Sequence, residues 1–147
     1  MVERLNEGEL AAYFALRSAG DRLQQAVARQ LKSHDLTEVQ FSILARLVDS
    51  TSGLRMSDLA RVLVVTKSGL TYQAGQLERR GLIARESSEV DDRAVVVRAT
   101  PQGADLIRKV MPGHIALVRE LFIDRLDPRE VATVRDALSR VGAPGEA

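Results

Sequence analysis

The segment from Lys67 to Gln76 holds a cluster of side chains that can form hydrogen bonds and that carry no negative charge. These side chains are Lys67, Ser68, Thr71, Tyr72 and Gln76. On a helical projection of about 100° per residue, Leu70, Ala74 and Leu77 share one face, while Ser68 and Tyr72 point the opposite way. An ordinary solvated helix face would carry interspersed acidic and basic pairs. The pattern therefore predicts a surface that contacts another macromolecule, with a plain solvated face as the alternative.

A second cluster of charge lies in the stretch SEVDDRA, residues 88–94. The β-branched and apolar residues on either side, at 82–87 and 94–99, predict two short strands, which makes this stretch the tip of a hairpin. Arg93 at such a tip could reach an anionic partner, and Asp92 could position it. The alternative is a solvated turn without a partner.

Other kinds of chemistry find little support in the sequence. It has no Gly-x-Ser-x-Gly, no glycine-rich phosphate loop and no His-Glu-x-x-His, and no serine is followed by lysine at the spacing of a Ser-x-x-Lys nucleophile. Cysteine is absent, and His34 and His114 are the only histidines, too few for a typical zinc site. We therefore expect a protein that is not an enzyme and that uses no metal or cofactor.

Composition places the chain among globular proteins of one domain. It has 147 residues, 45% of them hydrophobic and only 3% aromatic, so its core must consist mainly of aliphatic side chains. The 21 basic and 20 acidic residues give a net charge of +1, so any anionic partner must be recognised by local charge. The sequence shows neither a bilayer-spanning apolar run nor a signal peptide, and we expect a cytoplasmic protein without membrane contact.

Several helix starts can be read from capping residues. Thr37 and Gln40 form a capping box, with Leu36 and Phe41 as its hydrophobic staple. Further N-caps are expected at Ser57, Thr66, Thr100 and Asp127, the last two followed by proline. A long helix over 6–33 precedes them, and Gly81 suits the end of the fourth helix. We thus predict six helices, with the two strands between the fourth and the fifth.

The order of these elements over residues 36–100 is helix, short helix, tight turn, helix, strand, charged hairpin and strand. This order predicts a winged helix-turn-helix, a DNA-binding architecture. The predicted fold class is mainly α with a small β-hairpin wing (α+β). Residues 1–35 and 101–147 are expected to form a helical dimerisation region around the DNA-binding region at 36–100.

The run MSDLARVLVVTKSGLTYQAGQLERRGLIARESSEVDDRAVVVRATPQG resembles the MarR family of bacterial transcriptional regulators. The most specific pieces are SDLA-x-x-L, LERRGLI, the DDR turn and TPQG. The resemblance implies a homodimer held by the first, fifth and sixth helices, with the wing in the minor groove of a double-stranded DNA operator. It also implies release by a small aromatic or anionic effector that binds between the two regions.

Two departures from the family pattern reduce the positive charge that would face DNA. The wing reads Asp92-Arg93-Ala94 where the family commonly has Asp-Arg-Arg, and Tyr72 stands where a basic residue is common. A winged helix that binds only proteins is therefore the alternative function, since fold alone does not determine function. The candidate effector pocket is Tyr13, Arg17, His34 and Phe41, and each aromatic residue among them could instead belong to the core.

Overall fold

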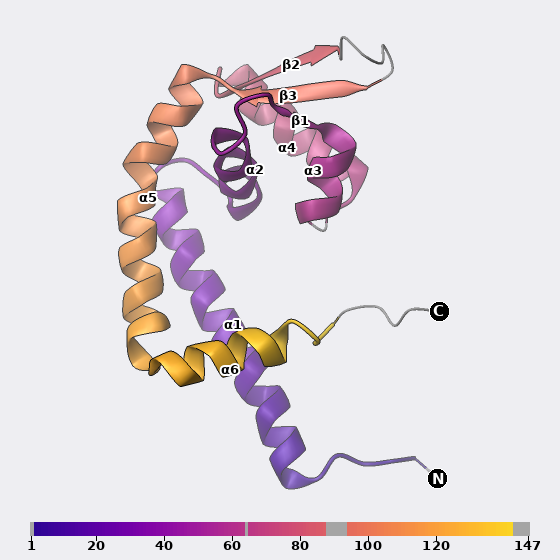
Figure 1. Ribbon diagram of the computed structural model, residues 1–147, viewed down its shortest axis with the longest axis vertical. Helices are drawn as coiled ribbons and strands as arrows, with labels where there is room; N and C mark the ends of the chain where they lie inside the picture. The colour runs from indigo at the N-terminus through magenta and orange to yellow at the C-terminus, as the bar shows by residue number, and fades with distance from the viewer. Residues whose placement is uncertain (1, 64, 88–93, 143–147) are drawn as a thin grey trace.

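The computed structural model describes residues 2–63, 65–87 and 94–142. Its helices are α1 (Glu7–Lys32), α2 (Glu38–Val48), α3 (Met56–Leu63), α4 (Lys67–Arg79), α5 (Pro101–Leu121), the 3-10 turn η1 (Ile123–Arg125) and α6 (Pro128–Leu138), and its strands are β1 (Leu54–Arg55), β2 (Ile83–Ser87) and β3 (Val95–Ala99). Figure 1 shows α2, α3, α4 and the sheet gathered into one lobe, from which α1, α5 and α6 extend as an arm. The predicted fold class, mainly α with a small β wing, is confirmed.

Side-chain caps fix where most of the helices begin. Thr37 and Gln40 form the predicted capping box, in which Gln40 N donates to Thr37 Oγ1 at 3.1 Å and Thr37 N donates to Gln40 Oε1 at 3.2 Å. Thr66, Thr100 and Asp127 cap α4, α5 and α6 as expected. The predicted cap at Ser57 is wrong, because β1 leads directly into α3 and Met56 is already helical.

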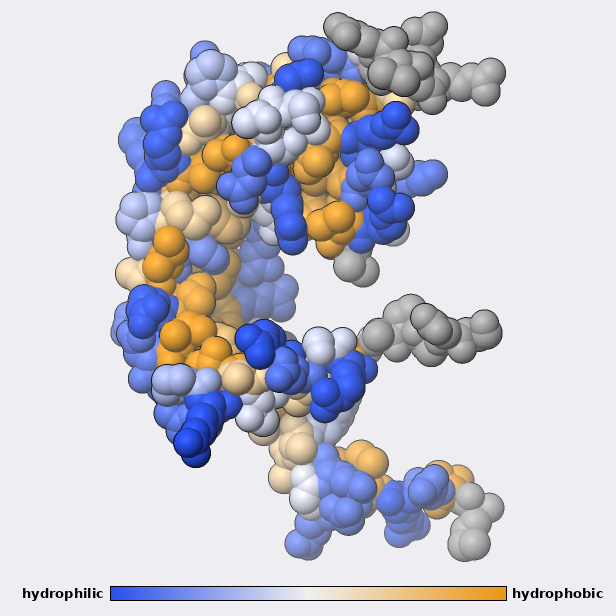
Figure 2. Space-filling model, viewed as in Figure 1, coloured by the Kyte–Doolittle hydropathy of each residue, from blue (hydrophilic) through white to orange (hydrophobic). Residues whose placement is uncertain are grey.

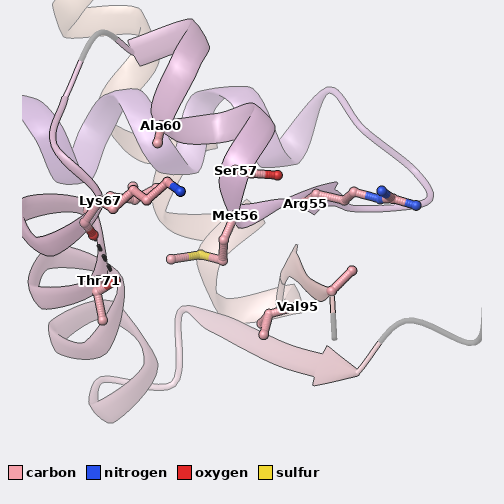
Figure 3. A pocket seen from close by; sticks show the side chains of 9 residues that line it. Arg55, Met56, Ser57, Ala60, Lys67, Thr71 and Val95 are labelled. Carbon is pink, nitrogen blue, oxygen red and sulfur yellow. Dashed lines mark hydrogen bonds between the residues drawn. The ribbon is translucent and has the colours of Figure 1, made fainter. Parts of the chain in front are cut away.

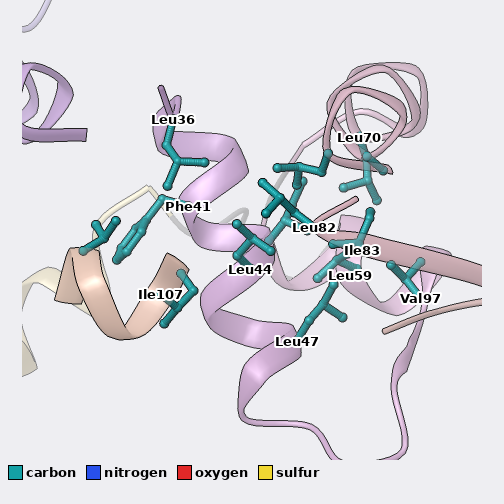
Figure 4. Close-up of a cluster of buried hydrophobic side chains, with 14 of the residues drawn as sticks. Leu36, Phe41, Leu44, Leu47, Leu59, Leu70, Leu82, Ile83, Val97 and Ile107 are labelled. Carbon is teal, nitrogen blue, oxygen red and sulfur yellow. The ribbon is translucent and has the colours of Figure 1, made fainter. Parts of the chain in front are cut away.

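Helix α2 forms the centre of the lobe. Its Ile43 and Leu44 are completely buried, and Leu47 is nearly so. Side chains from the surrounding elements complete this core, as Figure 4 shows for Leu59, Leu70, Ile83, Val97 and Ile107. Because Ile107 belongs to the first half of α5, the core also attaches the arm to the lobe.

The sheet is antiparallel in the order β1-β3-β2. Register pairs Leu54 with Val97 across β1 and β3, and Arg85 with Val97 across β2 and β3. The expected strands over 82–87 and 94–99 are each one residue shorter, and β1 was not predicted. Strand β1 matters because it holds β3, and with it the base of the wing, against the start of α3.

The arm exposes large apolar side chains. They lie on α1 (Leu10, Tyr13, Phe14 and Leu16), on α5 (Ile115) and on α6 (Leu138). No residue of α6 is buried, although the helix carries an apolar stripe. Figure 2 shows hydrophobic residues at the surface along α5, near its junction with α6. None of the described helices is long and apolar enough to cross a lipid bilayer.

Candidate nucleic-acid interface

The inner face of α4 is fixed by the core, and this determines which side chains face outward. Leu70, Ala74 and Leu77 are at most 1% exposed, as the helical projection predicted. Tyr72, on the opposite side, is 61% exposed, and Ser68 beside it is exposed as well. The first turn of α4 contains no acidic residue. The helix therefore presents an uncharged to positive, hydrogen-bonding surface to the outside.

The structure places the five candidate residues of α4 at different positions across that surface. Lys67 and Thr71 lie on the flank next to the wing, where both line one pocket. Ser68 and Tyr72 occupy the centre, and Gln76 lies on the other flank, where it lines a groove beside α2. Thr71 Oγ1 donates to the Lys67 carbonyl at 2.8 Å, so the acceptor side of this hydroxyl is the part left for a partner.

The pocket on the wing side has a volume of about 250 Å³. Figure 3 shows it between α3, α4 and the start of β3, with the thioether of Met56 at its floor. Arg55 and Lys67 are both among its lining residues, and Figure 3 shows the Lys67 side chain beside the pocket while the Arg55 guanidinium extends away from it. Arg55 was not among the predicted site residues. It belongs to β1, which left no clear pattern in the sequence.

Polar contacts attach α4 to the elements before it. Gln40, a buried polar residue, donates from Nε2 to Gln73 Oε1 at 3.0 Å while its own oxygen completes the capping box of α2. Arg80, just after α4, donates to the carbonyl of Asp35 at 2.6 Å. Asp35 has a φ of 57°, a left-handed conformation uncommon outside glycine, which this contact helps to hold. None of these contacts was predicted from the sequence.

A further polar contact joins α4 to the wing. Arg85 of β2 donates from Nε and from an η nitrogen to the two carboxylate oxygens of Glu78, at 2.9 and 3.1 Å. These hydrogen bonds lower the pKa of Glu78 from its ordinary value of 4.5, and they raise the pKa of Arg85. Glu78 is the one acidic residue of α4, and Arg85 neutralises it.

The predicted wing residues Asp92 and Arg93 lie outside the described residues. Ala94, where the family commonly has arginine, is half-buried and lines the pocket on the wing side. The base of the wing, in β2 and β3, is described and lies on the same side of the lobe as α3 and α4 (Figure 1).

The candidate effector residues do not form one pocket within a single chain. Tyr13 and Arg17 pair with each other in the first half of α1, where Arg17 donates to the Tyr13 hydroxyl at 2.9 Å. His34 follows the other end of α1. Phe41 is buried against His114 of α5, with ring centroids 4.7 Å apart, so it belongs to the junction between lobe and arm.

Comparisons with known proteins agree with this geometry. The MarR family profile matches residues 36–95, from just before α2 to the start of β3. AbsC, a MarR family transcriptional regulator from Streptomyces coelicolor, is 32% identical in sequence and has a TM-score of 0.90 over 95% of both chains. Sco3205, another from that species, was solved in complex with DNA; it is 28% identical, with a TM-score of 0.93 over 100% of this chain and 95% of its own.

A regulator from Bacillus subtilis is also similar to this chain along most of its length. The HTH-type transcriptional regulator MhqR is 24% identical over 138 residues, which cover 94% of each protein. Family profile, sequence relatives and solved structures all lead to regulators of transcription rather than to enzymes. This chain belongs to the MarR family of transcriptional regulators.

Proposed function

We propose that this protein is a homodimeric repressor that binds a palindromic site in double-stranded DNA and is released from it by a small molecule. The observation that carries the proposal is the outward face of α4, on which exposed Ser68 and Tyr72 lie beside Lys67 without a free carboxylate. Side chains of this kind on the second helix of a helix-turn-helix read base edges in the major groove. The DNA complex of Sco3205 supports the same partner.

The exposed apolar surface of the arm supports the dimer. Residues 1–35 and 101–147 would form the dimerisation region, in which α1, α5 and α6 bury their stripes against a second copy. A two-fold axis through this region would place the α4 helices of the two copies about 34 Å apart, one turn of DNA. Residues 36–100 would form the DNA-binding region of each copy, which would act on cytoplasmic DNA.

A groove of about 740 Å³ between the end of α1, the start of α2 and α4 supports a ligand response. Lys32 and Arg80 line it, but Asp35 and Glu38 balance their charge, so its mainly apolar walls favour an aromatic effector over a simple anion. Its contact with α4 would let a ligand move that helix. Its described lining includes none of the four pocket residues predicted from sequence, Tyr13, Arg17, His34 and Phe41.

The proposal is tested by selecting duplexes from a random-sequence library with the full-length protein. We expect enrichment of a palindrome whose half-sites are about 10 bp apart, bound by one dimer. Placed over a promoter in a reporter strain, this site should lower expression when the protein is present. Failure to enrich any sequence would favour the protein-binding alternative, and raised expression would identify an activator.

Replacing Tyr72 with alanine should weaken binding to the selected site by about 1–3 kcal/mol, because this side chain lies where base edges are read. Binding to random duplex should change little, since it depends on phosphate contacts. Fluorescence anisotropy with both duplexes measures the two affinities. An equal loss on both would make Tyr72 a backbone contact instead.

The Arg93→Ala change should weaken binding to all duplexes and lower the slope of log K against log salt by about 0.9 for each phosphate that the variant no longer neutralises. Ala94→Arg should tighten binding and steepen that slope. Arg108→Ala on α5 removes the same charge from an exposed arginine and serves as the control. If Arg93→Ala and Arg108→Ala behave alike, the wing tip does not meet DNA.

A further inference from the structure

Beyond Ala84 on β2 and Val97 on β3, no described residue of the two wing strands toward the tip is buried. Along β2, Ile83 is buried, but the strand becomes exposed from Arg85 to Ser87. On β3, Val97 is buried, whereas Val95, nearer the tip, is 41% exposed. Pairing with β1 ends at Val96, and the next described pair of the hairpin is Ser87 with Val95, between β2 and β3 alone.

The ion pair between Glu78 and Arg85 lies at the level where this apolar support ends. Arg85 is opposite Val97 in the sheet, and Glu78 is in the last turn of α4. The pair uses both carboxylate oxygens and two guanidinium nitrogens, so it fixes direction as well as distance. By contrast, the contact between Arg98 and Glu86 stays within the hairpin and is longer, at 3.6 Å.

We propose that Glu78 and Arg85 are positioning residues that hold the wing at a fixed angle to α4, so that both can contact the same DNA duplex at once. This inference rests on the proposed DNA-binding function. The pair places a negative charge on α4 near the interface, which is unfavourable for DNA binding. It also holds α4 and the wing in the relative arrangement that they need on DNA before the DNA binds. Without it, the wing would have to be ordered during binding, and its contribution to the affinity would be smaller.

Charge alone predicts the opposite result, which makes the hypothesis decidable. The Glu78→Gln change removes an acidic group from a surface that would face phosphates, so simple electrostatics predicts tighter DNA binding. Tighter DNA binding is also expected if Arg85, once released from Glu78, binds a phosphate itself. Positioning predicts weaker binding, by about three- to tenfold, as expected when two coupled groups are separated. Arg85→Lys, which keeps the charge but lacks the planar fork, should weaken binding too.

The experiment measures the affinity of the full-length protein for a duplex selected from a random library. The variants are Glu78→Gln, Arg85→Lys and Arg93→Ala, with Glu78→Gln also combined with Arg93→Ala. In the wild type, Arg93→Ala should lower the affinity several-fold, whereas in the Glu78→Gln background its effect should fall below about twofold. The salt slope of Glu78→Gln should fall as well, because a wing that is not held in place neutralises fewer phosphates.

Asp105→Asn is the matched control, since it removes one carboxylate from an exposed ion pair with Arg108 on α5 and changes the net charge equally. It should leave DNA affinity unchanged, and melting temperatures of all variants show whether the fold is intact. Unchanged or tighter binding by Glu78→Gln, or full additivity with Arg93→Ala, would overturn the positioning role. If the wild type itself binds no duplex, it is the proposed function that fails.

Discussion

Replacing Leu138 with glutamate should convert the protein into a monomer that no longer holds its operator. Leu138 is 42% exposed on α6, a helix that buries none of its residues within one chain. In the proposed dimer this side chain lies in the interface, where an unpaired carboxylate costs about 3–5 kcal/mol. Counted for one of the two copies, such a cost raises the dimer dissociation constant by about two to four orders of magnitude.

The loss of operator binding follows because a monomer can engage only one half-site. Linking two DNA-binding regions raises the affinity for a palindrome by a factor of about 10² to 10⁴, and this gain disappears with the dimer. Sedimentation velocity at micromolar concentration measures the assembly, and fluorescence anisotropy measures the binding. Phe14→Glu on α1, also exposed, should behave in the same way.

Val62→Glu is the matched control for assembly, because Val62 is an apolar side chain of similar exposure, 49%, but lies on α3 in the lobe. This variant should remain a dimer. A wild-type protein that sediments as a monomer, or a Leu138→Glu variant that remains a dimer with full operator affinity, would contradict the proposed arrangement of the arm.

The sequence predicted the parts of the fold that local interactions determine. A capping box such as Thr37 and Gln40 needs only four consecutive residues, and the periodicity of Leu70, Ala74 and Leu77 needs only one helix. Even so, the capping box of Asn6 and Glu9 at the start of α1 was missed, because Asn6 precedes a helix whose first turns have no buried stripe.

Elements that depend on partners elsewhere in the chain could not be predicted. Strand β1 has two residues and exists only because β3 pairs with it. Its presence also explains the wrong cap at Ser57, since β1 runs straight into α3 and the helix begins at Met56, two residues before the start that a Ser57 cap would give. A serine alone does not report how the preceding strand enters the helix.

In the candidate interface, too, the features set by local interactions were predicted and those set by distant residues were not. Helical periodicity was enough to choose the outward residues of α4, because the core side of that helix is plainly apolar. The contacts that hold α4 in place were missed, because Gln40 and Gln73 are 33 residues apart and Asp35 and Arg80 are 45 apart. Polar side chains at such separations leave no periodic signal, and many surface glutamines and arginines would have been equal candidates.

Gly103 gives a structural reason for the glycine in the TPQG helix start, and it leads to a prediction about stability. Gly103 is buried in the first turn of α5, packed against the end of the turn that precedes β2. A Cβ at this position would overlap the Leu82 carbonyl oxygen and lie 3.2 Å from Leu44 Cδ2. The Leu82 carbonyl also accepts the Thr100 N–H at 3.0 Å, so it cannot move away without breaking a hydrogen bond.

The Gly103→Ala variant should therefore be destabilised by about 3 kcal/mol, the upper end of the range for overpacking, although alanine is the better helix former by about 1 kcal/mol. For a chain of this size the melting temperature should fall by about 6–12 °C. Gly20→Ala on α1 is the control, because a Cβ there has no neighbour within 4 Å, and it should leave the melting temperature unchanged or raise it. Thermal unfolding followed by circular dichroism compares the two variants. If the melting temperatures of Gly103→Ala and Gly20→Ala are both equal to or higher than that of the wild type, then α5 does not approach Leu82 this closely. The attachment of the arm to the lobe must then differ from the one described.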